Sequence, residues 1–429
     1  TMAADVKILR GNIIHTPVFG ELGTLAGGYL VLEDGVIQGI FPVLPERYAA
    51  CPVENWGDRL IMPAFADMHL HAPQYPMLGM GMDLPLLEWL NAYTFQTEER
   101  FADLDYARRV YRRLAEELIA NGTTRVVMFS SRHADATLVL MEELERAGVC
   151  GCVGKVNMDR NSGVAQETTE TSMAETLRWL DGCRFDHVKP ILTPRFTPSC
   201  SDELMAFLGR LARERDLPVQ SHLSENLDEV AWVRRLHPDC GRYWETYEKF
   251  GLWKEGTLMA HCVHSDEAER GAMAGHGVWA VHCAASNVNL CSGTAPVRRL
   301  LEDGVRVALG SDVAGGDQVA MYQVVTASIR ASKIRSIETG DRPLTVPEAF
   351  YLGAAAGQRY FGGGAGFVPG EKLHAIVGDE GAFPEPVRAL TLAERCERAV
   401  YLMDKRSILA VYSDSRRVDR KERAHGGEI

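Results

Sequence analysis

The chain has 429 residues, of which 46% are hydrophobic and 24% charged, and this balance excludes a disordered or fibrous protein. A chain of this length is expected to form one large α/β barrel with an accessory domain, or two medium domains. Its formal net charge of −12 disfavours nucleic-acid binding, which depends on clustered Lys and Arg, so we expect a small-molecule partner and no nucleic acid.

No stretch near the start of the sequence combines a basic segment, an apolar centre and a small-residue cleavage site. No run of about eighteen apolar residues occurs either. We therefore expect a cytoplasmic protein with no membrane partner. The 10 cysteines show no regular spacing and no C-x-x-C pair, so we expect neither disulfides nor a thiolate zinc site.

The first part of the chain, residues 1–64, contains strand-like runs separated by glycine turns. The runs cover residues 6–9, 29–32 and 36–41, with turns at Gly27-Gly28 and Asp34-Gly35. This pattern predicts one part of a small β domain.

Residues 65–365 repeat a different pattern, in which short apolar, β-branched runs alternate with amphipathic stretches. The runs cover residues 60–68, 123–129, 149–158, 187–193, 217–221, 257–260, 278–281 and 305–309, and helices are expected at 104–120, 135–147, 168–180 and 202–216. Repeated βα units of this kind predict a (β/α)8 TIM-like barrel. An open doubly wound sheet would need a glycine-rich phosphate loop after an early strand, and none is present.

Two further segments complete the predicted organisation. Residues 72–101 contain no strand signal and follow the first barrel strand, where a functional lid is expected. In residues 366–429, strand signals return at 373–377, 399–402 and 407–412. We expect both chain ends to form one small β-sandwich domain beside the barrel.

Metal-ligand side chains follow several of the predicted barrel strands. They are His69, His71, His222, His261 and Asp312. The carboxyl ends of the strands are where such barrels carry their chemistry, and alternate residues of a strand share a face, so His69 and His71 point the same way. An isolated H-x-H pair is more often structural, but its recurrence with histidine and aspartate at other strand ends favours a divalent metal.

Other histidines and other zinc signatures carry less weight. His282 also follows a predicted strand, and it fits a residue lining the site as well as one packed beneath it. His133 and His264 match no motif and are treated as structural or as part of the pocket wall. The sequence has no H-E-x-x-H helix, and it has no H-x-E with P-C-x-x-C of the smaller cytidine-deaminase fold.

Several motifs resemble one known family, in order along the chain. They are residues 63–74 (PAFADMHLHAPQ), 83–90 (DLPLLEWL), 154–159 (GKVNMD), 193–196 (TPRF), 221–226 (SHLSEN) and 309–316 (LGSDVAGG). The first motif resembles the first-strand signature of the amidohydrolase superfamily, and the set as a whole is similar to guanine deaminases.

This resemblance implies a metal site held by His69, His71, His222 and Asp312 with one Zn²⁺ per chain. Two-metal members of the superfamily commonly bridge their ions with a modified lysine at the end of the fourth strand. That region here reads TPRF, and Lys189 lies at the start of the strand. A mononuclear site is therefore expected.

The resemblance also implies the roles of individual residues. Glu225 would shuttle a proton to the ring, Asp312 would accept a proton from the attacking water, and His261 would orient that water or stabilise the developing charge. Substrate-binding residues would be Gln74, Arg195, Phe196 and His222, with Trp89 a further candidate for packing on the ring.

The expected reaction is the hydrolytic deamination of guanine to xanthine and ammonia in purine catabolism, by a homodimer. A close alternative is a deaminase of a related aminated heterocycle, such as a pterin or 8-oxoguanine, with the same metal chemistry. A less favoured alternative is a non-catalytic scaffold of the same fold. A scaffold need not keep its ligands, and here all four ligands and Glu225 are present.

Overall fold

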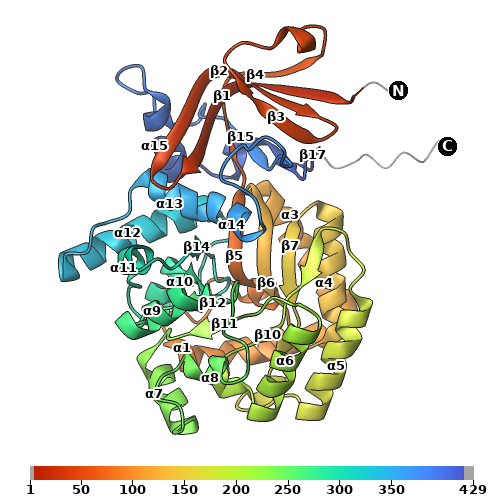
Figure 1. Ribbon diagram of the computed structural model, residues 1–429, viewed down its shortest axis with the longest axis vertical. Coiled ribbons are helices and arrows are strands. Elements are labelled where there is room, and N and C mark those ends of the chain that lie inside the picture. The colour runs from red at the N-terminus through yellow and green to blue at the C-terminus, as the bar shows by residue number, and fades with distance from the viewer. Residues whose placement is uncertain (1–3, 420–429) are drawn as a thin grey trace, which may run out of the picture.

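The computed structural model describes residues 4–419. The parts of the predicted small β domain that fall on residues 1–3 and 420–429 lie outside the described residues. Within the described range the fold is α/β, with a mixed sheet at one end of the molecule and helices around parallel strands at the other (Figure 1).

Strands from both chain ends meet in one seven-stranded sheet, with the order β17-β16-β15-β4-β1-β2-β3. Its strands are β1 (Val6–Val18), β2 (Glu21–Glu33), β3 (Val36–Phe41), β4 (Val53–Pro63), β15 (Ala375–Gly378), β16 (Ile408–Ser413) and β17 (Arg416–Arg417). Side chains from β1 to β4, β15 and β16 share one buried apolar cluster, so this sheet curls around its own core.

The parallel strands form two four-stranded sheets and one short pair. They are β5 (Phe65–His71), β6 (Thr123–Phe129), β7 (Cys150–Gly154) and β9 (Val188–Pro190); β11 (Gln220–Leu223), β12 (Leu258–His261), β13 (Trp279–His282) and β14 (Val307–Leu309); and β8 (Val156–Asn157) with β10 (Thr193–Pro194). These strands are almost wholly buried because helices cover them from outside.

The two four-stranded sheets approach each other at both of their edges. The Asp312 backbone N–H donates to the His69 carbonyl at 2.8 Å, and the His71 N–H donates to the Val313 carbonyl at 2.9 Å. At the other edge, Leu192 and Val219 form an isolated parallel bridge. The carboxyl ends of β5, β11, β12 and β14 are therefore held around one centre.

Most of the helices surround these parallel strands, while α15 (Leu392–Leu402) packs beside β1 and β2 of the terminal sheet. These helices are α3 (Leu104–Ala120), α4 (Ala134–Ala147), α5 (Thr169–Gly182), α6 (Asp202–Glu214), α7 (Leu227–Leu236), α8 (Glu245–Glu248), α9 (Glu267–His276), α10 (Ala284–Asn289), α11 (Val297–Glu302), α12 (Met321–Thr339), α13 (Val346–Gly353), α14 (Ala355–Tyr360) and α15. In α3, Asp103 caps the N-terminus by accepting from the backbone N–H groups of Asp105 and Tyr106. The helices expected from the periodicity at 104–120, 135–147, 168–180 and 202–216 all form.

The first predicted run, residues 60–68, was wrong as a single strand. The chain divides there between β4, which ends at Pro63 and pairs with β1 and β15, and β5, which begins at Phe65 and pairs with β6. Both strands are buried at this point, so apolar composition alone does not mark the boundary between them.

The strand predicted at residues 399–402 was also wrong, because these residues form the last turn of α15. Thr391 caps this helix and accepts from the Glu394 backbone N–H, while the Glu394 side chain accepts from the Thr391 N–H. Cys396, Ala399 and Val400 are buried at helical spacing. The capping box and this spacing outweigh the strand-like run.

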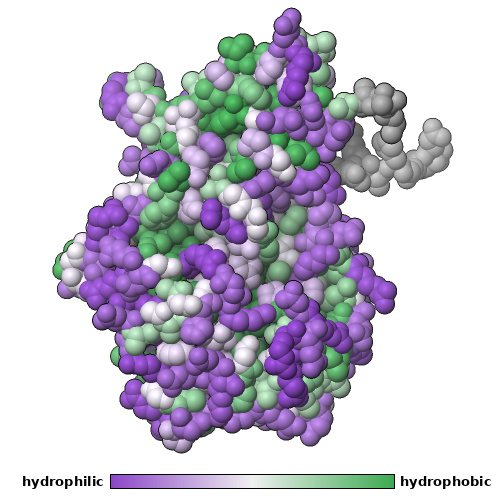
Figure 2. Space-filling model, viewed as in Figure 1, coloured by the Kyte–Doolittle hydropathy of each residue, from purple (hydrophilic) through white to green (hydrophobic). Residues whose placement is uncertain are grey.

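Residues 72–101 contain no strand and instead form a chain of short turns and helices. These are η2 (Ala72–Met77), α1 (Leu86–Trp89), η3 (Leu90–Thr94) and α2 (Phe95–Glu99), followed by η4 (Arg100–Ala102). The face of the molecule in Figure 2 is largely hydrophilic over the helices that surround the parallel strands. None of the described helices has the length and apolar character needed to cross a bilayer.

Candidate active site

Five side chains gather where the parallel strands end. His69 and His71 lie on β5, His222 on β11 and His261 on β12, and Asp312 follows β14. All five are buried, with exposed fractions of 8% or less. The alternation of a strand places His69 and His71 on one face, as their spacing predicts.

The ligand-type atoms of this cluster lie within hydrogen-bond range of one another. His71 Nε2 is 3.2 Å from His222 Nε2 and 3.3 Å from Asp312 Oδ1. His69 Nε2 is 3.1 Å from Asp312 Oδ1, and His261 Nε2 is 3.5 Å from Asp312 Oδ2. Imidazole nitrogens and a carboxylate at such mutual distances could bind a divalent metal ion.

Neighbouring groups orient two of these side chains, His222 and Asp312. His222 Nδ1 contacts the Arg195 carbonyl at 2.5 Å, and Ser286 Oγ donates to Asp312 Oδ2 at 2.7 Å. These contacts leave His222 Nε2 and Asp312 Oδ1 facing the cluster. Among the described residues, the buried His69 Nε2 forms no hydrogen bond of good geometry, although it lies 3.1 Å from Asp312 Oδ1, and this fits an atom that would bind a metal.

The electrostatics of the cluster favour its metal-binding protonation states. Burial lowers the pKa of His71 and lowers that of His222 well below its ordinary value. Burial alone would raise the pKa of Asp312, but the neighbouring His69 and His261 hold it well below its usual range. Neutral imidazoles and an ionised carboxylate are the forms that coordinate metals.

Three residues at this centre have a backbone conformation that is uncommon for residues with a side chain. The φ angles are 49° at Ser224, 81° at His261 and 46° at Asp312. Such angles are uncommon outside glycine and cluster at functional sites, where the surrounding structure maintains them. No motif in the sequence indicates this strain.

Glu225 lies between β11 and α7, close to the metal-type cluster. Its Oε2 is 3.3 Å from His261 Nε2, while Oε1 is buried without a partner among the described residues. Its backbone N–H donates to Glu229 Oε2 at 3.1 Å. Burial, and then the charge of Glu229, raise the pKa of Glu225 well above its usual range, so the surroundings favour the protonated form of this carboxyl.

A cavity that is partly open to solvent lies over these residues. It is lined by His71, Gln74, Leu86, Trp89, Leu90, Arg195, Phe196, His222, Glu225, His261, Leu290 and Asp312. The structure thus brings every predicted site residue to one place, since His69 lies beneath the cavity in contact with Asp312.

The predicted recognition side chains share a partner that sequence reasoning missed. Arg195 donates from Nη1 and Nη2 to the two carboxylate oxygens of Glu98, each at 2.8 Å. Gln74 Nε2 donates to Glu98 Oε2 at 3.1 Å, and Gln74 Oε1 accepts from the Ala314 N–H at 3.0 Å. Glu98 stands beside Glu99 in the sequence, and no motif distinguishes the two.

The three histidines that carried less weight in the sequence, His282, His133 and His264, do not line this cavity. His282 is buried at the end of β13, and its Nδ1 has no partner within the described range. His133 contacts Glu99, and His264 Nε2 contacts the Ser292 carbonyl at 2.9 Å. These contacts fit structural roles.

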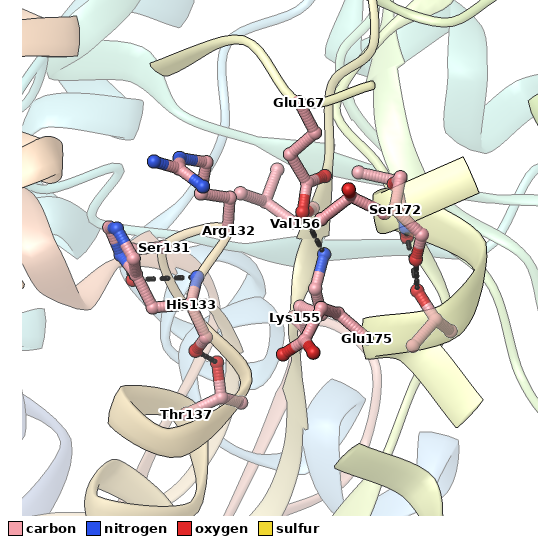
Figure 3. A network of polar contacts seen from close by, with 12 residues as sticks. Ser131, Arg132, His133, Thr137, Lys155, Val156, Glu167, Ser172 and Glu175 are labelled. Atoms are coloured by element: carbon pink, nitrogen blue, oxygen red, sulfur yellow. Dashed lines mark hydrogen bonds and ion pairs between the residues drawn. The ribbon is translucent and has the colours of Figure 1, made fainter. Parts of the chain in front are cut away.

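Two lysines near the strand ends are engaged elsewhere. Lys155 follows β7, is fully buried and points to Glu167, with its Nζ 2.9 Å from Glu167 Oε1 (Figure 3). It also donates to the Val156 carbonyl at 3.2 Å. Lys189 lies on β9 and donates to the Phe185 carbonyl. Neither lysine is among the residues that line the cavity.

Replacing Lys155 by Ala is expected to lower the free energy of unfolding by about 3–5 kcal/mol, because it leaves the Glu167 carboxylate buried without its partner. Arg178→Ala is the control, since Arg178 is half-exposed where it pairs with Asp135 and Glu175 and should cost at most about 1 kcal/mol. Urea denaturation followed by circular dichroism measures both. A Lys155 variant as stable as the Arg178 variant would contradict this estimate.

The chain is similar to known proteins along most of its length. The sequence model of the amidohydrolase family matches residues 60–362. A guanine deaminase from Dictyostelium discoideum is 35% identical over 435 residues, covering 95% of this chain and 97% of that protein. The guanine deaminase of Homo sapiens is 37% identical over 435 residues, covering 97% and 94%.

A solved structure is also similar to the whole fold. It is the guanine deaminase from C. acetobutylicum with bound guanine in the active site, which has a TM-score of 0.93 and 42% sequence identity. The match covers 96% of this chain and 100% of that one.

Proposed function

Because the chain belongs to the amidohydrolase family and is a hydrolase of the guanine deaminase type acting on C–N bonds, we propose that it converts guanine and water to xanthine and ammonia in purine catabolism. The observation that carries this proposal is the cavity in which His71, His222 and Asp312 lie beside Glu225 and Arg195. One cavity thus joins metal-type ligands, a proton carrier and a donor for a purine carbonyl.

The proposed architecture is a closed (β/α)8 barrel over residues 65–365, with residues 1–64 and 366–429 forming a small β-sandwich domain. The hydrogen bonds between β5 and the segment after β14 support closure, as does the bridge between Leu192 and Val219. The curled terminal sheet supports the second unit.

The proposed cofactor is one Zn²⁺ per chain, held by His69, His71, His222 and Asp312. The donor set supports it, because nitrogen and carboxylate ligands suit zinc, and two of the four side chains are oriented by neighbouring contacts. When bound there, zinc supplies a nucleophile from water near neutral pH. The engagement of Lys155 and Lys189 elsewhere supports a single ion.

Three side chains would act on the attacking water, two of them by transferring protons. Asp312 accepts the proton of the attacking water, and His261 orients that water, held itself by the 2.8 Å contact of its Nδ1 with Asn287 Oδ1. Glu225 delivers its proton to the purine ring nitrogen, takes up the proton of the added hydroxyl and passes it to the departing amine, and the proton on Asp312 then restores Glu225. Its position 3.3 Å from His261 supports a role beside the reacting carbon.

The recognition side chains would bind the planar, carbonyl-bearing edge of guanine. Within the described range, Arg195 uses only part of its five N–H groups, so it can donate further to a carbonyl such as guanine O6. Phe196 and Trp89 provide apolar surface for the ring, and Gln74 and His222 complete the wall.

Guanine is therefore expected to be the best substrate and adenine a poor one. Adenine has hydrogen at the carbon that carries the amine of guanine, and it carries an amine where guanine has O6, so in the same orientation it offers no leaving group and Arg195 faces a donor in place of an acceptor. We expect kcat/KM for guanine to exceed that for adenine by about a hundredfold or more. Ammonia release should be measured for guanine, adenine, 8-oxoguanine and a pterin. Equal values for the two purines would refute the role of Arg195, and a preferred pterin or 8-oxoguanine would support the alternative substrate.

A homodimer and a cytoplasmic location are further proposals. The dimer depends on the family resemblance, and light scattering of the purified protein tests it. The 10 cysteines are all free, which is typical of a protein kept in a reducing compartment and supports the cytoplasm.

A further inference from the structure

Glu98 occupies a position that neither motif nor comparison assigns. It lies on the short helix α2, inside the segment that covers the cavity, and is only 1% exposed. Its carboxylate accepts hydrogen bonds from both Arg195 and Gln74. A buried carboxylate needs such partners, and these two line the cavity.

We propose that Glu98 is a positioning residue that fixes Arg195 and Gln74 together, and so sets the preference of the site for a purine with a carbonyl at this edge. The proposal depends on the proposed function, because it assigns the carbonyl of guanine to Arg195. Glu98 itself acts through these two side chains and is not assigned a contact with the substrate.

The geometry of the Glu98–Arg195 pair determines which donors remain available. A guanidinium has five N–H groups in a rigid plane, and two parallel bonds to one carboxylate fix the orientation of that plane. The other N–H groups then point in set directions. The carboxylate also neutralises the Arg195 charge, which suits a neutral purine ligand.

The same carboxylate determines which way the Gln74 amide faces. Glu98 can only accept when ionised, so the Gln74 atom beside it must be the NH2 group, and the Gln74 oxygen faces the Ala314 N–H. The Arg195 guanidinium holds the pKa of Glu98 below its usual value against the effect of burial. The amide therefore presents a fixed remaining N–H to its surroundings.

These contacts also connect recognition to the metal-type cluster. The carbonyl of Arg195 is the partner of His222 Nδ1, and Ala314 lies two residues beyond Asp312. Because His222 contacts the backbone carbonyl of Arg195 and Glu98 contacts its side chain, we expect loss of Glu98 to disturb binding of the carbonyl edge first, while the ligand residues keep their own contacts.

Glu99 provides a matched control on the same helix. Its carboxylate pairs with Arg132, at 2.9 Å to Nε and 2.5 Å to Nη2, and it is partly exposed. It does not line the cavity. Glu99→Gln therefore removes the same charge from α2, together with an arginine pair, but leaves Arg195 and Gln74 in place.

The test compares Glu98→Gln and Glu99→Gln with guanine and with 2-aminopurine, which has hydrogen in place of the carbonyl. For Glu98→Gln we expect the ratio of kcat/KM values, guanine over 2-aminopurine, to fall by about tenfold to a hundredfold. The fall should come mainly through a raised KM for guanine, because the lost interaction is made in the ground state as well. Glu99→Gln should leave the ratio within about twofold of the parent.

Four further measurements separate positioning from a general loss of structure. Zinc content and the midpoint of thermal unfolding show whether each variant is folded and loaded. If Glu98→Gln does not fold, Glu98→Asp keeps the charge but shortens the side chain, and it should still lower the ratio. In an Arg195→Lys background, Glu98→Gln should have little further effect on the ratio, because both changes act on one interaction.

A parent enzyme that deaminates guanine, with an unchanged ratio in both Glu98 variants, would overturn the proposal. An equal fall in the Glu99 variant would overturn it as well, since the effect would then belong to α2 as a whole. A metal-loaded parent that releases no ammonia from guanine would instead refute the proposed function.

Discussion

The His71→Ala variant is expected to lose metal and activity together. His71 Nε2 lies 3.2 Å from His222 Nε2 and 3.3 Å from Asp312 Oδ1, at the centre of the proposed ligand set. His71 is buried, with 4% of its surface exposed. Substitution of a residue that only hydrogen-bonds to a metal ligand already lowers metal affinity by about 10–100-fold, and loss of a ligand itself lowers it further. Elemental analysis should show zinc falling from one equivalent toward zero, with ammonia release falling in parallel.

His133→Ala is the control for this variant. His133 is also a histidine near a strand end, but its ring contacts Ser131 and Glu99 away from the cavity. It should keep its metal and most of its activity. A His71 variant that retains one equivalent of zinc and near-parental turnover would show that the ligand set is wrong.

Glu225→Gln is expected to keep its metal and lose most of its turnover. The amide is nearly isosteric with the carboxyl and lies outside the proposed ligand set, so fold and zinc content should change little. It cannot carry a proton, and general acid–base contributions are typically about 10²–10⁴-fold. We expect a loss toward the upper end, because one group serves both the ring nitrogen and the departing amine.

The measurement for Glu225→Gln combines zinc content, the affinity of a purine inhibitor and kcat. Normal zinc and near-normal inhibitor affinity with a collapsed kcat are the expected pattern. Turnover within a few-fold of the parent would show that the proton moves by another route. Asp312 would then be the first residue to test, because its Oδ2 also lies 3.5 Å from His261 Nε2.

The sequence predicted the metal-type cluster because a simple rule places it. Polar residues that follow parallel strands converge at one end of the strands, so His69, His71, His222, His261 and Asp312 could be brought together without knowing any distance. The longer helices were predicted for a similar reason, since apolar residues at helical spacing decide which face of a helix is buried.

What could not be predicted depends on contacts between distant segments. Glu98 and Glu99 are adjacent and chemically identical, and only the fold places Glu98 against Arg195, far along the chain, while Glu99 meets Arg132. The division at Pro63 between β4 and β5 is likewise determined by the partners of each strand. The strand expected at 399–402 failed because the capping box at Thr391 starts a helix upstream.

The most direct test of the central claim is the conversion of guanine by purified protein of known zinc content. We expect xanthine and ammonia in equal amounts, at a rate that rises with zinc up to one equivalent per chain. Removal of zinc by a chelator should abolish the rate, and added zinc should restore it. Protein that carries one equivalent of zinc and leaves guanine unchanged would contradict the proposed function.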